Sequence, residues 1–270
     1  MTRHIALIAG SGSLVLTVIT AIRNHGDSLS VLGVVPRDDL GADAIHISGA
    51  QIEPLLAAIR KIGPSHVAMA GAIHISDSER RALAVAAGQQ DATPVGDMAL
   101  GAIADKLRQL TGAELIDLDR LVPELMAPVG RIAGPAPTIE QEKVAAFAFE
   151  RARAAGSLDL FQALVASGRR LVAAEDIGGT DLLLDRILAF RERGLVGTGV
   201  AMALAKVSKP GQPAFFDLPA IGPVTVTKAA RAGIGAIVVE AGRTLLLEKP
   251  ALEAEASQLG VSVFGRKADG

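Results

Sequence analysis

Cysteine is absent from this chain of 270 residues, and tryptophan and tyrosine are absent as well. Without cysteine there is no disulfide, no thiolate nucleophile and no cysteine-ligated zinc or iron–sulfur site, as is typical of proteins of the reducing cytoplasm. Phenylalanine is the only aromatic residue and the formal net charge is −2, so we expect neither a base-stacking nor a basic surface. The composition therefore argues against a nucleic-acid partner.

Long apolar runs are also missing, because polar or glycine residues interrupt every stretch that could span a bilayer. Half of the residues are nonetheless apolar and 21% are charged, which favours a large folded core over disorder. The apolar N-terminus is similar to a signal peptide, but Gly10 and Gly12 interrupt it and favour a strand that runs into a helix. We expect a cytoplasmic protein; a protein acting on a lipid could still contact a membrane peripherally.

Strands and helices alternate along the first half of the chain. Short apolar runs predict strands at residues 4–9, 29–35, 66–70 and 113–116. Periodic segments between them predict helices at residues 14–24, 52–62, 76–87 and 97–110. This spacing is typical of βαβ units, so we predict an α/β protein with a Rossmann-like, parallel, doubly wound sheet in its N-terminal domain.

A proline- and glycine-rich stretch without clear periodicity, residues 127–138, marks the predicted domain boundary. We predict an N-terminal domain at 1–132, a linker at 133–138 and a distinct C-terminal catalytic α/β domain at 139–270. Helices are expected in the second half at 139–155, 180–193, 224–232 and 250–258. Strands are expected there at 160–166, 169–174, 235–239, 243–247 and 261–264.

The densest run of glycine and proline is residues 206–223, KVSKPGQPAFFDLPAIGP. Its one carboxylate, Asp217, lies between apolar residues that partly dehydrate it, so the charged form needs a partner such as a cation. Lys206 and Lys209 lie nearby, and the N-terminus of the helix expected at 224–232 would favour an anion. The run therefore suggests a site for a phosphate and a divalent metal, although Asp217 as a turn residue is an equally weighted alternative.

A second polar run, EDIGGTD at residues 175–181, follows a predicted strand and opens a helix. Capping by Thr180 or Asp181 explains one acidic residue but not all three around a Gly-Gly pair. Oxygen ligands in such a loop suit Mg²⁺, which takes one or two carboxylates together with substrate phosphates. Asp159, a polar point in an apolar region, is a further candidate for the same surface.

The turn after the first strand, Gly10 to Ser13, is similar to a dinucleotide-binding fingerprint, whose glycines let the backbone approach a pyrophosphate. Val15 occupies the position of the third glycine, which disfavours a nicotinamide cofactor and hence an oxidoreductase. A phosphate, nucleotide or sugar at this helix start and a purely structural turn both remain open.

Taken together, these blocks resemble a known family, the LpxI-type UDP-2,3-diacylglucosamine pyrophosphatases. The resemblance extends almost from end to end. It rests on IAGSGSL at 8–14, GDMALGAIADKL at 96–107, LVPELMAPVG at 121–130, SLDLFQ at 157–162, EDIGGTDLLLDRI at 175–187, KPGQ at 209–212, DLPAIGPVTV at 217–226 and IVVEAGRTLLLE at 237–248. The last four blocks, in that order, are specific.

The resemblance implies Mg²⁺-dependent hydrolysis of UDP-2,3-diacylglucosamine to UMP and 2,3-diacylglucosamine 1-phosphate (lipid X) in lipid A biosynthesis. The family's essential aspartate aligns with Asp217, which would hold Mg²⁺ or orient the attacking water. We assign metal binding to Asp217, Asp181 and Glu175. We assign substrate binding to Gly10, Ser11, Gly12, Ser13, Gly179, Thr180, Lys206, Lys209 and Gln212. Peripheral contact with the inner membrane is expected, and a homodimer is left open.

Several positions depart from the family pattern. Pro213 and Phe215 stand where the family has an acidic and then a basic residue, and Met98 and Ala72 replace residues of two further motifs. A lost carboxylate beside Asp217 would weaken a metal site, and lost basic residues would weaken pyrophosphate binding. The alternative to an active enzyme is therefore an impaired relative that binds a lipid or nucleotide-sugar ligand without turnover.

Overall fold

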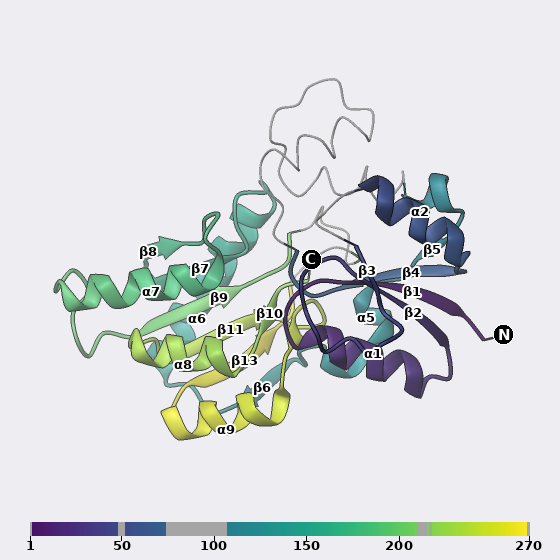
Figure 1. Cartoon of the computed structure of the whole chain (residues 1–270). Helices are drawn as coiled ribbons and strands as arrows, with labels where there is room; N and C mark the ends of the chain where they lie inside the picture. The colour runs from purple at the N-terminus through teal and green to yellow at the C-terminus, as the bar shows by residue number, and fades with distance from the viewer. Residues whose placement is uncertain (1, 48–51, 74–106, 210–214, 216–217, 269–270) are drawn as a thin grey trace. The chain divides into compact units, whose positions relative to one another are not determined.

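The computed structural model of the chain describes residues 2–47, 52–73, 107–209, 215 and 218–268. They form two compact units, shown in Figure 1. The first unit comprises the described residues up to Pro123 together with Phe215, and the second comprises those from Glu124 onward apart from Phe215. No helix within the described part of the chain combines the length and the apolar character needed to cross a bilayer.

A five-stranded parallel sheet forms the centre of the first unit, in the strand order β3-β2-β1-β4-β5. Its strands are β1 (His4–Ala9), β2 (Ser28–Gly33), β3 (Ile45–His46), β4 (His66–Ala70) and β5 (Glu114–Leu115). The order reverses direction between β1 and β4, the place where doubly wound sheets open a crevice. This topology confirms the predicted Rossmann-like parallel sheet.

Helices pack on the first sheet through their apolar stripes. They are α1 (Leu14–Asn24), α2 (Ile52–Ile62) and α5 (Leu118–Leu121). Leu56 and Ile59 of α2 lie in one buried cluster with Ala6 and Ile8 of β1, and Phe215 joins the same cluster. Helix α1 contacts β1, β2 and β4. The helix predicted at 76–87 and most of the one at 97–110 lie outside the described residues.

The second unit is built on a six-stranded mixed sheet in the order β6-β13-β11-β9-β7-β8. Its strands are β6 (Gly130–Ala133), β7 (Ala163–Ser167), β8 (Arg170–Ala174), β9 (Met202–Lys206), β11 (Ala236–Glu240) and β13 (Ser262–Arg266). Strands β9, β11 and β13 are parallel to one another, whereas β6, β7 and β8 pair antiparallel. This distinct α/β unit confirms the second part of the predicted fold class.

Helices cover both faces of the second sheet (Figure 1). The four are α6 (Ile139–Gly156), α7 (Gly179–Glu192), α8 (Pro223–Arg231) and α9 (Lys249–Leu259). Alternate residues of a strand point to opposite faces. Accordingly, Ala203 and Ala205 of β9 pack in the cluster with α6, whereas Met202 and Leu204 pack in the cluster with α7, α8 and α9. The small alanines let α6 lie close to the sheet.

The secondary structure differs from expectation at several points. The expected irregular stretch 127–138 contains β6, which pairs with the distant β13. Strand β9 was not predicted. The strand expected at 243–247 shortens to β12 (Leu245–Leu246), which pairs with β10 (Ala220–Ile221) in a separate two-stranded sheet. A short 3-10 helix, η1, spans Pro123–Leu125.

Candidate functional site

Three polar segments of the second unit meet at one edge of its sheet. They are the turn with Asp159, the loop at 175–181 and the segment at 206–209, and the order and direction of the strands bring them together. Parallel strands β9 and β11 end at this edge, at Lys206 and Glu240. Strand β7 starts at the same edge because it runs antiparallel and its Ala163 lies opposite Lys206. Strand β8 ends there too, at Ala174. Ligands of α/β sheets bind outside the carboxyl ends of the parallel strands, so this edge is the candidate site.

Lys206, Thr180 and Glu175 form a continuous hydrogen-bonded chain at this edge. The Lys206 Nζ donates to Thr180 Oγ1 over 2.8 Å, and Thr180 Oγ1 donates to Glu175 Oε1 over 2.6 Å. The same ammonium donates to the Ala220 carbonyl over 3.0 Å. These contacts are partly buried, so the lysine is ordered before any ligand arrives, which reduces the entropic cost of binding an anion. The structure thus brings together three residues that were singled out separately in the sequence.

Lys209 and Asp159 form a second charged pair at the edge. The Lys209 Nζ lies 2.9 Å from Asp159 Oδ1, with the side chains only 11% and 21% exposed. Asp159 adopts a left-handed backbone conformation with φ of 56°, which fixes the turn between α6 and β7. Lys209 is therefore partly neutralised by Asp159 and held in place.

Asp181 takes a different direction from its neighbour Thr180. Its carboxylate lies 3.7 Å from the Lys228 ammonium, which also lies 2.9 Å from Asp185 Oδ2. Residues four apart share a helix face, whereas consecutive residues point about 100° apart. Asp181 and Asp185 therefore face α8, and Thr180 faces β9. Gly179 opens the helix with φ of +73°, a conformation that favours glycine.

The metal ligands predicted from the sequence are Asp217, Asp181 and Glu175. Among the residues that the structure describes, no three His, Asp or Glu side chains cluster closely enough to hold a metal ion. Of the predicted metal ligands, Glu175 is the one that belongs to the hydrogen-bonded network of Lys206 and Thr180. Asp217 and Gln212 lie outside the described residues.

The loop that carries Glu175 is braced from the outside by Asp176. The Gly178 amide donates to Asp176 Oδ1 over 2.9 Å, and Arg186 Nη1 donates to Asp176 Oδ2 over 2.6 Å. The Gly178 hydrogen bond, and then the Arg186 guanidinium, hold the pKa of Asp176 below its ordinary value of 3.8. The loop is therefore braced most firmly when Asp176 is ionised.

We expect this brace to weaken in acid. Because the pKa of Asp176 is lowered in the folded protein, its stabilisation is present above the ordinary value of 3.8 and is lost as the pH falls through the lowered value. The difference in urea unfolding midpoint between the wild type and Asp176→Asn should therefore be constant near neutral pH and shrink in strong acid. A difference that grows on acidification would contradict this assignment.

The glycine turn of the first unit is closed by the end of β4. The Gly10 amide donates to the Ala70 carbonyl and the Ser11 amide to the Ala72 carbonyl, each over 2.9 Å. The Ser11 hydroxyl also donates to Ala72 over 3.0 Å. A Cβ on Gly10 would lie 2.5 Å from the Ala72 carbonyl oxygen, so only glycine fits. The amides of Gly10 and Ser11 are thus engaged within the protein.

Arg37, which sequence reasoning missed, lies against this turn. Its Nη1 donates to the Gly10 carbonyl over 2.6 Å, and its guanidinium forms a two-point pair with Asp39 at 2.6 and 2.8 Å. The hydrogen bond from Arg37 lowers the pKa of Asp39. The sequence gives no signal for this contact, because residues 10 and 37 meet only through the pairing of β1 with β2.

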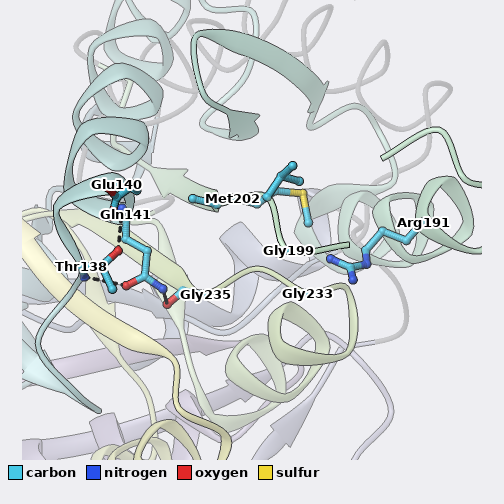
Figure 2. A pocket seen from close by; sticks show the side chains of 10 residues that line it. Thr138, Glu140, Gln141, Arg191, Gly199, Met202, Gly233 and Gly235 are labelled. Atoms are coloured by element: carbon cyan, nitrogen blue, oxygen red, sulfur yellow. Dashed lines mark hydrogen bonds between the residues drawn. The ribbon is translucent and has the colours of Figure 1, made fainter. Parts of the chain in front are cut away.

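A cavity of about 460 Å³ opens at the opposite edge of the second sheet, near the amino ends of β9 and β11. Figure 2 shows Arg191 beside Gly233 and, at the other side, Thr138 and Gln141 bonded to one another. Gln141 also donates to the Gly235 carbonyl over 3.2 Å. Thr138 and Gln141 form the capping box of α6, so their hydrogen bonds are accounted for by the fold. We therefore favour the carboxyl edge as the functional site, where four of the predicted residues gather.

Comparison with known proteins agrees with the two-part architecture. Residues 4–125 match the model of the LpxI N-terminal domain, and residues 128–264 match that of the LpxI C-terminal domain. The chain is 31% identical over 276 aligned positions to a protein of Caulobacter vibrioides named UDP-2,3-diacylglucosamine pyrophosphatase LpxI, covering 97% of each chain. With both domains matched in order and a relative aligned over nearly its full length, the chain belongs to the LpxI family.

Proposed function

We propose that this protein hydrolyses the pyrophosphate of UDP-2,3-diacylglucosamine to UMP and 2,3-diacylglucosamine 1-phosphate, a step of lipid A biosynthesis. The name of the Caulobacter vibrioides relative and the full-length match support this substrate. The observation that carries the proposal is the chain from Lys206 through Thr180 to Glu175 at the carboxyl edge. A diphosphate needs fixed cations, and this edge holds two ordered lysines.

The lysines would act on charge that develops during the reaction. When water attacks one phosphorus of the diphosphate, negative charge builds on the transferring phosphoryl oxygens and on the leaving phosphate. Donors that are already oriented stabilise this charge without reorganising, which is the larger part of such catalysis. Lys206, tied to Thr180 and to the Ala220 carbonyl, has this property. Glu175, on the far side of Thr180, keeps the hydroxyl turned so that its oxygen accepts from the lysine.

We further propose that Mg²⁺ takes part, with Asp217 and Glu175 as its protein ligands. Carboxylate oxygens are the hard ligands that this ion prefers, and one or two suffice when substrate phosphates complete the shell. Bound Mg²⁺ would supply charge neutralisation at the diphosphate. Asp181 could contribute only by leaving Lys228, which lies 3.7 Å away. This arrangement would weaken Asp181 as a ligand relative to Glu175.

The remaining proposed contacts concern the rest of the substrate. Gln212 is proposed to contact the substrate, and the turn of the first unit, Gly10 to Ser13, is proposed to lie against its phosphate or sugar. The two acyl chains of the substrate would bring a cytoplasmic enzyme to the inner membrane surface as a peripheral protein. A homodimer is compatible with these proposals and is not required by them.

The proposal is tested by UMP release from the diacylated nucleotide sugar. We expect turnover with Mg²⁺, loss of turnover with excess EDTA, and recovery when Mg²⁺ is restored. The alternative is a relative that binds the substrate without turnover. Phe215 favours it, because this buried side chain stands where the family has a basic residue. Binding of the substrate with no UMP released, with or without Mg²⁺, would support that reading and remove the enzyme proposal.

A further inference from the structure

Glu240 is a buried carboxylate at the carboxyl edge of the second sheet. It ends β11, the strand beside β9, and is 8% exposed. Its Oε2 accepts the Ser208 amide over 2.8 Å and the Ser208 hydroxyl over 2.9 Å. Arg243 donates from Nε to the same hydroxyl over 3.4 Å. A carboxylate removed from water needs such donors, and charge-assisted hydrogen bonds are about twice as strong as neutral ones.

Ser208 lies between the two lysines of the candidate site. Lys206, two residues earlier, is tied to α7 and β10, and Lys209, the next residue, is tied to Asp159 before β7. Glu240 adds an anchor from a third place in the fold, since β11 lies on the other side of β9 from β7. The segment that leaves β9 is therefore held by Glu240 of β11 and by Asp159 in the turn before β7, with Ser208 between the two lysines.

We propose that Glu240 is a positioning residue for diphosphate binding and hydrolysis. By fixing the amide and the hydroxyl of Ser208, it sets where Lys206 and Lys209 present their ammonium groups. This inference rests on the proposed function for the identity of the ligand. Glu240 itself does not touch the diphosphate, and its effect is transmitted through the backbone at 206–209.

The test compares Glu240→Ala, Glu240→Gln and a matched control. Alanine removes both hydrogen bonds to Ser208, so the backbone at 206–209 no longer fixes the positions of the two lysine ammonium groups. We expect KM for the diacylated nucleotide sugar and the Kd for UDP, measured by calorimetry, to rise about 10- to 100-fold. Glutamine keeps an accepting oxygen and should stay within about fivefold of the wild type. The control is Ser262→Ala, a buried serine at the opposite edge whose hydroxyl has no partner among the described residues; it should change neither constant.

Amide hydrogen exchange gives a readout that does not depend on turnover. In Glu240→Ala the Ser208 amide should exchange faster, while amides in the middle of β11 keep wild-type protection. A general loss of structure would instead lower the active fraction and leave KM unchanged. If Glu240→Ala does not fold, Ser208→Ala removes one of the two hydrogen bonds and should raise the Kd for UDP by a smaller factor.

The outcomes separate this inference from the proposed function. A folded Glu240→Ala with unchanged UDP affinity, unchanged KM or unchanged Ser208 exchange overturns the positioning role. A wild type that binds UDP but releases no UMP removes the proposed hydrolysis. In that case a weakened UDP affinity in Glu240→Ala, with Glu240→Gln near the wild type, would still support Glu240 as the residue that positions the diphosphate-binding lysines.

Discussion

Asp217→Asn should lower kcat for UMP release by about 10³-fold or more. Asparagine keeps the size of the side chain but removes the charge, and the charge is what either proposed role requires. An amide holds Mg²⁺ more weakly than a carboxylate does, and it cannot take a proton from an attacking water. Phe215, two residues earlier, and Leu218, the next residue, are 2% and 6% exposed, and a polar side chain of the same shape as aspartate should leave both in place.

The matched control is Asp185→Asn on α7. This carboxylate also belongs to the second half of the chain, but it is 52% exposed and pairs with Lys228. Exposed pairs contribute little, so we expect kcat within about twofold of the wild type. Both variants are compared by initial rates of UMP release at saturating Mg²⁺ and by far-ultraviolet circular dichroism. An active Asp217→Asn, or an equal loss in Asp185→Asn, would refute the assignment of Asp217.

Phe215→Ala should destabilise the first unit by about 3–5 kcal/mol. Phe215 is among the largest fully buried side chains, although it lies between two stretches of the second unit in sequence. Its ring packs in the cluster that contains Ile8 of β1, Leu32 of β2 and Leu56 of α2. Truncation would leave a cavity inside that cluster. The departure from the family pattern at this position therefore replaces a charge by a packing contact.

The loss of stability in Phe215→Ala is measured by urea unfolding. Circular dichroism is the probe, because a chain without tryptophan offers little intrinsic fluorescence. If the two units unfold separately, only the transition of the first should shift. Phe215→Leu keeps most of the volume and should cost less than about 1.5 kcal/mol. Phe190→Ala, at a half-buried position of α7 in the second unit, should leave the first transition in place. A loss below about 1 kcal/mol in Phe215→Ala would mean that the cluster does not depend on the ring.

Local sequence patterns predicted much of the secondary structure. The run HIALIA followed by glycine predicted β1, and LVLTVITAIRN predicted α1, with the bounds that the structure shows. The start of α6 was predicted at Ile139, where the structure begins the helix, and the end was predicted one residue early; in the structure Thr138 and Gln141 form a capping box at this start. Such features depend on residues a few positions apart, which a single sequence displays directly.

Strands β6 and β9 were missed for a physical reason. The β9 sequence MALAK is rich in alanine and ends in lysine, residues that are depleted in strands. It is a strand because β7 and β11 pair with it on both sides. Strand β6 lies in a proline- and glycine-rich stretch and is defined by its pairing with β13. In both cases tertiary pairing outweighs local propensity.

The members of the candidate site were predicted better than their contacts. Glu175, Thr180 and Lys206 were each singled out, but nothing in the sequence showed that they form one chain. Asp181 was grouped with Glu175 because the two are close in sequence, and the helix turns it toward Lys228 instead. Glu240 follows the strand predicted at 235–239 and was not singled out in the sequence, and its attachment to Ser208 spans 32 residues.

By itself the sequence determined the class of fold, the absence of thiol chemistry and, through its ordered motifs, the family. Composition, the spacing of apolar residues and short motifs are properties of the sequence itself, so they can be recognised without the structure. Only the tertiary structure decided which charged groups meet, because that depends on the order and register of strands far apart in sequence. Those pairings hold Lys206 and Lys209 at one edge of the second sheet, with Glu240 fastening the chain between them.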